Sequence, residues 1–116
     1  MSGDSEFIAR ADAVLAAVGA ALDAAIEASD ADIDWSLIDG VLTIDCGRAG
    51  KLIVNRHVPN REIWVAAKSG GFHFRAAGGA WQDSRNGEEL GAALVRLLRE
   101  QADVAVDLPA LPAQGS

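Results

Sequence analysis

One stretch in the middle of the chain restricts its fold more than any other. Between Lys51 and Phe74, apolar residues recur at every second position in three short runs, separated by a turn containing Pro59 and by Ser-Gly-Gly at 69–71. A period of two is typical of β-strands with one buried face, and proline and glycine favour turns between antiparallel neighbours. The stretch therefore predicts three antiparallel strands. Their core-facing residues are Leu52, Val54, Ile63, Val65, Phe72 and Phe74.

The opposite face of these strands has a different character, because Trp64 is predicted to stand there beside an amide and cationic side chains. A tryptophan exposed on such a face is typical of a protein interface, and a partly covered core tryptophan is the alternative. The inward positions of Ile63 and Val65 favour exposure. The face carries Lys51, Ile53, Asn55, Trp64, Ala66, His73 and Arg75.

The N-terminal segment is predicted to be a helix, because its apolar residues recur at spacings of three and four. Asp4 or Ser5 is expected to cap it, and it should end near residues 28–29. A strand should begin within residues 30–35, and Asp39-Gly40 predicts a hairpin to the next strand. The helix stripe is Phe7, Ala11, Val14, Leu15, Val18, Leu22, Ala25 and Ile26, and the inward strand residues are Ile33, Trp35, Leu37, Leu42 and Ile44.

The C-terminal part combines a short strand, a second helix and a tail. The strand is predicted around Trp81. The helix should begin at an Asn86 cap, with Glu89 completing a capping box, and reach about Ala102. The tail is apolar but interrupted by prolines, so it is expected to lie extended against the helices, with residues 114–116 frayed.

These elements define the fold class as α+β, a two-layer sandwich with two helices packed on one face of a five- to six-stranded antiparallel sheet. The 116 residues, half of them hydrophobic, are expected to form one domain over residues 1–116, with 104–116 as an extended tail. The first residues include acids where a signal peptide needs a basic start, and no apolar run approaches the roughly 18 residues of a membrane span. We therefore expect a cytoplasmic protein without membrane contact.

The net charge of −7 is unevenly distributed. Residues 1–45 carry ten Asp and Glu against one Arg, whereas residues 46–116 carry nine Lys and Arg against seven Asp and Glu. Such polarity suits cationic partners or metal ions at one end and argues against nucleic-acid binding. Cys46 is the only cysteine, which excludes an internal disulfide and a cysteine-based zinc site.

Acidic residues around the end of the first helix are a candidate metal site. Asp23 and Glu27 share a helix face, and Asp30, Asp32 and Asp34 follow at the junction with the strand. A hard, oxygen-seeking cation would relieve their repulsion, and a solvated acidic face that keeps the protein soluble is the alternative. Any such binding should be weak, because exposed carboxylates lack the converging ligands of a buried site.

No catalytic constellation can be assembled from these residues. The acidic pairs are predicted on exposed faces, whereas a catalytic carboxylate needs a pocket that raises its pKa. His57 and His73 lie on different strands with no close pair, and no nearby residue favours the thiolate of Cys46. We expect the protein to have no catalytic activity of its own.

Four short motifs are spread along the chain: SEF at residues 5–7, GVLTI at 40–44, NRxxPxxxIW at 55–64 and AxKxGGFHF at 66–74. Together they resemble the signature of the frataxin family, especially its bacterial CyaY members, and the resemblance covers essentially the whole chain. It implies an α-β sandwich that binds iron weakly on an acidic ridge. It also implies docking onto the cysteine desulfurase and scaffold protein that build iron–sulfur clusters.

By position, the resemblance implies two sets of site residues. The metal-binding ridge corresponds to Asp12, Asp23, Glu27, Asp30, Asp32 and Asp34. The partner-binding surface on the sheet corresponds to Asn55, Arg56, His57, Trp64 and His73. The ridge is thinner than in bacterial relatives, because alanine and glycine fill much of the first helix and Ser36 stands where an acid is frequent.

Three functional hypotheses follow. The favoured one is a monomeric adaptor that docks on the cysteine desulfurase complex and carries weakly bound ferrous or ferric iron. The second is an iron store that forms oligomers around the metal. The third is an acidic interaction module without a metal role, whose partner binding would weaken steeply with salt.

Overall fold

Six strands form one antiparallel sheet, and each strand pairs with the one that follows it in the chain. The computed structural model describes residues 3–113. The strands are β1 (Asp34–Ile38), β2 (Val41–Asp45), β3 (Lys51–His57), β4 (Glu62–Ala67), β5 (Gly70–Ala77) and β6 (Ala80–Asp83). A 3-10 turn, η1 (Gly47–Ala49), joins β2 to β3, and the long helices are α1 (Gly3–Ser29) and α2 (Leu90–Ala102).

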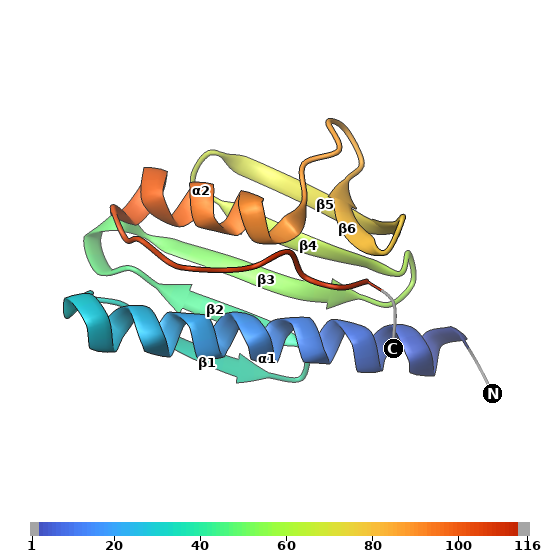
Figure 1. Ribbon diagram of the computed structural model, residues 1–116, viewed down its shortest axis with the longest axis horizontal. Coiled ribbons are helices and arrows are strands. Elements are labelled where there is room, and N and C mark those ends of the chain that lie inside the picture. The colour runs from blue at the N-terminus through green and yellow to red at the C-terminus, as the bar shows by residue number, and fades with distance from the viewer. Residues whose placement is uncertain (1–2, 114–116) are drawn as a thin grey trace.

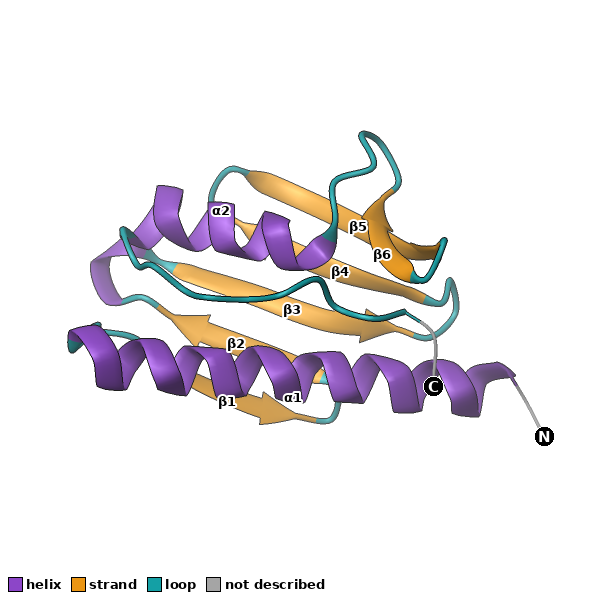
Figure 2. Ribbon diagram, in the orientation of Figure 1, coloured by secondary structure: helices purple, strands orange, loops and turns teal. Residues whose placement is uncertain are grey.

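Both helices lie on the same side of the sheet (Figures 1 and 2), so the predicted α+β sandwich is confirmed, with six strands. The sheet turns its apolar positions toward them: Leu52, Val54, Ile63 and Phe74 are fully buried, as the period of two predicts. Phe72 is only half-buried. No helix within residues 3–113 lies over the other face of the sheet, which we call the open face (Figure 2).

Helix α1 buries the predicted apolar stripe except for Ile26, which is half-buried, and ends at Ser29, as expected. A glycine in its middle lets the sheet approach closely, since a Cβ at Gly19 would lie 2.7 Å from the ring of Trp35. The predicted cap is wrong, because α1 already includes Asp4 and Ser5. Asp4 instead pairs with Arg61 at 3.1 Å. No helix within residues 3–113 is long and apolar enough to cross a membrane.

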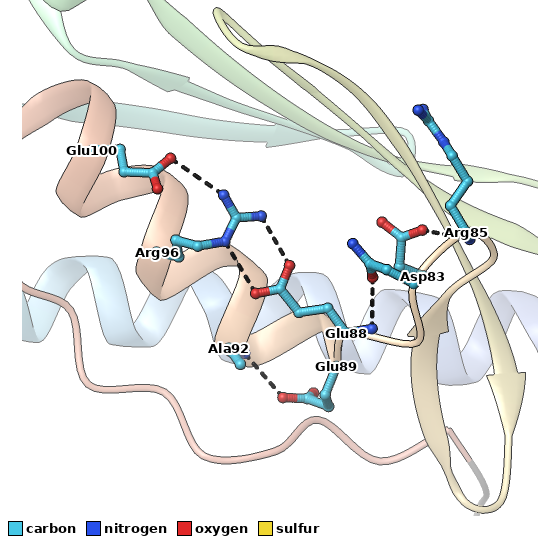
Figure 3. Close-up of polar contacts among 8 residues, drawn as sticks. Asp83, Arg85, Glu88, Glu89, Ala92, Arg96 and Glu100 are labelled. Carbon is cyan, nitrogen blue, oxygen red and sulfur yellow. Dashed lines mark hydrogen bonds and ion pairs between the residues drawn. The ribbon is translucent and has the colours of Figure 1, made fainter.

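The start of α2 differs from the prediction. Glu89 is its N-cap, and the carboxylate accepts hydrogen bonds from the backbone N–H groups of Gly91 (2.8 Å) and Ala92 (2.9 Å; Figure 3). Asn86 accepts from the N–H of Glu88 at 2.8 Å, inside the preceding turn. Gly87 has a φ of 77°, so the Asn-Gly pair forms a turn and the helix cannot begin there.

The segment after α2 runs extended between the two helices (Figure 1). Its Leu111 N–H donates to the same Glu89 carboxylate at 2.9 Å, and the carbonyl of Pro112 accepts from Trp81 Nε1 at 3.0 Å. Leu111 and Ala113 are buried. Glu89 therefore joins the start of α2 to the tail. The expected fraying at 114–116 lies outside the described residues.

We expect Gly91→Ala to destabilise the protein by about 1–2 kcal/mol, although alanine favours helix by about 1 kcal/mol. The reason is steric, because a Cβ at Gly91 would lie 2.7 Å from the carbonyl oxygen of Pro109 and would push the tail away. Urea denaturation measures the change. The control is Ala92→Gly at the neighbouring exposed position. It should lower stability only through the poorer helix propensity of glycine. A Gly91→Ala variant as stable as the wild type would show that the tail does not pack there.

Candidate docking and metal-binding surfaces

The strand register brings the predicted docking residues into adjacent rows of the open face. Asn55, Trp64 and His73 are direct neighbours across β3, β4 and β5. In the next row, His57 lies opposite Glu62, which lies opposite Arg75. Two of these six residues, Glu62 and Arg75, were not among the predicted site residues.

The sequence led us to expect an exposed Trp64 on the open face. In the structure the side chain is on that face but is partly covered. Its indole is half-buried and stacked between two imidazoles. The ring centroids lie 3.7 Å from His57 and 4.5 Å from His73, with interplanar angles of 10° and 13°. Because β3 and β5 flank β4 on opposite sides, the imidazoles cover the two opposite faces of the indole. We call these three side chains the Trp64 stack; His57 and His73 lie on different strands, as predicted, and the indole between them joins them.

Glu62 fixes the edge of this indole. The residue is only 3% exposed, and its carboxylate accepts from Trp64 Nε1 at 2.8 Å and from the Arg75 guanidinium at 2.7 Å. Burial alone would raise the pKa of Glu62, but the two hydrogen bonds and the charges of Arg75 and His73 outweigh it and hold the pKa below its ordinary value. The Trp64 indole is thus held by both faces and by its N–H.

Glu62 could have been predicted from the sequence as a neighbour of Trp64 in the candidate site. It precedes Trp64 by two residues in the same strand, so the two must share a face. Its burial could not have been foreseen, because the side chains that cover it come from neighbouring strands.

Arg56 is the predicted docking residue that the structure places elsewhere. It follows Val54 at a spacing of two and therefore faces the helices, where it forms an ion pair with Asp12 of α1. Its guanidinium lies against Gly40, whose φ of 77° belongs to the hairpin turn between β1 and β2. The expectation that Arg56 shares a face with Trp64 is wrong, and the pair ties α1 to the hairpin.

Asp12 is separated from the other acidic candidates. Asp23 follows Asp12 by eleven positions in the helix, a rise of about 16 Å. Asp23 itself accepts a hydrogen bond from Trp35 Nε1 at 2.8 Å, and Glu27 lies one turn further on. We use the name acidic ridge for the remaining exposed carboxylates, Asp23, Glu27, Asp30, Asp32 and Asp34.

The acidic ridge bends around the edge of the sheet. Trp35 packs on α1, so its neighbour Asp34 points to the open side, directly opposite Asp45 of β2. Asp45 extends the ridge and was not predicted. Within residues 3–113, no group of three or more Asp, Glu, His or Cys side chains is arranged to hold a metal ion. A metal ion on the ridge would therefore be held by one or two carboxylates and by water. Asp34 and Asp45 place two like charges opposite each other on adjacent strands.

Comparison with known proteins places the chain in a family. The family model described as the frataxin-like domain matches residues 1–104. The chain belongs to the frataxin family. An iron–sulfur cluster assembly protein CyaY from Paraburkholderia phymatum is 48% identical over 105 residues, which cover 90% of this chain and 96% of that protein. The protein of the same name from Ralstonia nicotianae is 44% identical over 107 residues, 92% of this chain and 95% of that one.

Solved structures of frataxins have the same fold. The frataxin of Psychromonas ingrahamii is 33% identical, with a TM-score of 0.74 over 91% of this chain and 97% of that one. A trimeric frataxin from the yeast Saccharomyces cerevisiae, complexed with ferrous iron, is 30% identical, with a TM-score of 0.72 over 81% of this chain and 86% of that one. This chain therefore has the fold of the solved frataxins.

We expect the stability of the protein to fall in acid partly through Glu62. A carboxyl whose pKa is depressed in the folded state contributes stability above its unfolded pKa of about 4.3, and this contribution is lost as the pH falls through the folded pKa. Glu62→Gln should therefore lower the free energy of unfolding by about 1–3 kcal/mol near neutral pH, and the difference from the wild type should shrink in acid.

Urea denaturation over a series of pH values measures this difference. Glu100→Gln is the control, because it removes a carboxylate from an exposed pair with Arg96 (3.2 Å; Figure 3). It should change stability by less than about 0.5 kcal/mol. A constant gap between Glu62→Gln and the wild type at all pH values would contradict the role given to the Glu62 charge.

Proposed function

We propose that this protein is a non-catalytic adaptor of iron–sulfur cluster assembly, which docks on the cysteine desulfurase and its scaffold protein and binds iron weakly on the acidic ridge. Membership of the frataxin family and the names of the CyaY relatives support the pathway. The observation that carries docking is the Trp64 stack, an ordered aromatic group on a sheet face that no helix covers.

The order of Trp64 matters for binding. Association normally loses the conformational freedom of interface side chains, by about 0.5–1.5 kcal/mol for each one immobilised. The indole of Trp64 is already held by His57, His73 and Glu62, so little freedom remains to be lost. Tryptophan is enriched among the residues that dominate binding energy at protein interfaces. Asn55 beside it offers an amide for a directional hydrogen bond.

The acidic ridge supports weak, exchangeable iron binding. Its carboxylates are exposed and belong to three consecutive pieces of chain: α1, the loop after it and β1. Iron ions are relatively hard cations in the ferric and, less strongly, the ferrous state, and an ion held by one or two carboxylates completes its coordination with water. Asp12 is the least favourable candidate, because Arg56 already neutralises it. The ferrous iron of the yeast frataxin supports the choice of metal.

An NMR titration tests the two halves of this proposal separately. Anaerobic ferrous iron should shift or broaden the amides from Asp23 to Asp34 and leave the Trp64 stack unchanged. Purified cysteine desulfurase, at fixed salt, should perturb the stack, and Trp64→Ala should weaken its binding by about 2 kcal/mol. The double variant Asp23→Asn with Glu27→Gln is the matching change on the ridge. It should weaken iron binding and leave the Trp64 stack unchanged.

Each alternative function has its own outcome. Growth of the particle with added iron, measured by sedimentation, would favour an iron store. Desulfurase binding that ignores iron and disappears at high salt would favour an acidic interaction module. A ridge untouched by iron would remove the metal role while leaving the adaptor role intact.

A further inference from the structure

The Trp64 stack is one end of a longer row of side chains. The register pairs Ile38 of β1 with Val41, Val41 with Asn55, Asn55 with Trp64 and Trp64 with His73. Direct partners in antiparallel strands point to the same face, so the five side chains form one line across the open face. Four strand spacings make this line about 19 Å long.

The β1 end of this row is apolar and exposed. Ile38 is 68% exposed and Val41 is 38% exposed. Single exposed aliphatic residues are common on proteins. Here two of them are adjacent, continue the line of Trp64 and are followed by the half-buried Ile53 in the next row. A partner that covers Ile38 and Val41 would therefore gain binding free energy from burying their apolar surface.

The β5 end of the row presents hydrogen-bond donors. Arg75 is 65% exposed at its side chain, and His73 is exposed beside it. Glu62, the carboxylate at this end, is buried and already bonded to Arg75 and Trp64. An incoming carboxylate would therefore meet donors here without competition from an exposed acid.

The two different ends argue against a second copy of the chain as the occupant. Two copies related by a twofold axis would bring Ile38 against His73 if the rows were antiparallel, and would bring His73 against His73 if they were parallel. The first arrangement places an aliphatic group on an imidazole, and the second brings the His73 ends together with an Arg75 beside each. Neither supplies a carboxylate to which Arg75 could donate hydrogen bonds.

We propose that the docking surface is the whole row from Ile38 to His73, and that it receives a loop of a protein partner. The loop carries a branched apolar side chain over Ile38 and Val41, and a carboxylate roughly 14–19 Å away at His73 and Arg75. This inference rests on the proposed adaptor function and specifies the partner surface for it. Trp64 then lies near the middle of the interface, with recognition on both sides of it.

The test is a double variant, Ile38→Thr with Val41→Thr, which keeps β-branched side chains in both strands and replaces a methyl or ethyl group by a hydroxyl. Leu37→Thr is the matched control, because Leu37 is 37% exposed at the same hairpin but points to the side of the helices. Binding to purified cysteine desulfurase, to the scaffold protein and to their complex is measured by calorimetry. Urea denaturation of all variants checks that folding is unchanged.

We expect the double variant to raise Kd roughly tenfold or more for the partner that binds this face, and Leu37→Thr to leave Kd within about twofold. His73→Asp, which places a carboxylate at the other end, should also weaken binding, and added salt should reduce this effect.

Three outcomes overturn the inference. If the wild type binds and the double variant binds equally well, the apolar end is not part of the interface, although the adaptor function stands. If the wild type binds neither protein nor their complex, the adaptor function itself falls. If sedimentation shows that the wild type self-associates and the double variant does not, with partner binding unchanged, the occupant is a second copy.

Discussion

Alternation of side chains between the two faces of the sheet is the constraint on which the rest of this molecule depends. Leu42, Leu52, Ile63 and Phe74 have no exposed surface, because every second residue of their strands faces the helices. The residues between them must face the other way. A slip of one residue in any strand would exchange the two faces, so the burial of the core also fixes the position of Trp64.

On the open face, the buried carboxylate of Glu62 is tolerated because both of its oxygens accept hydrogen bonds. An isolated buried charge is strongly unfavourable, but Glu62 accepts a hydrogen bond on each oxygen, one of them from a cation. In return, Glu62 holds the indole of Trp64 while two imidazoles cover its faces. The polar network thus makes the Trp64 indole rigid without help from the hydrophobic core.

The two candidate surfaces are distinct but meet on β1. Asp34 and Ile38 project from the same strand to the same side, with Ser36 between them. The acidic ridge begins at one end of this strand and the apolar end of the proposed docking row lies at the other. On α1, the pair of Arg56 with Asp12 fastens the hairpin that carries Ile38 and Val41. The hairpin is therefore held from the helix side while its open side remains free.

Much of the fold and part of the site could be predicted from local patterns. The periods of two and of three to four residues predicted the strands and both helices, and Asp39-Gly40 predicted its hairpin. The cap of α2 was missed, because Asn86-Gly87 forms a turn of its own and leaves capping to Glu89. The face of Arg56 could have been read from the same alternation that placed Val54.

The sequence by itself determined which residues share a face, because that depends on spacing along one strand or helix. Only the tertiary structure decided which residues meet across strands. The stack of His57, Trp64 and His73, and the line from Ile38 to His73, both depend on the register of several strands at once. Register is set by the packing of the whole core and by the lengths of the turns, and no single segment contains that information.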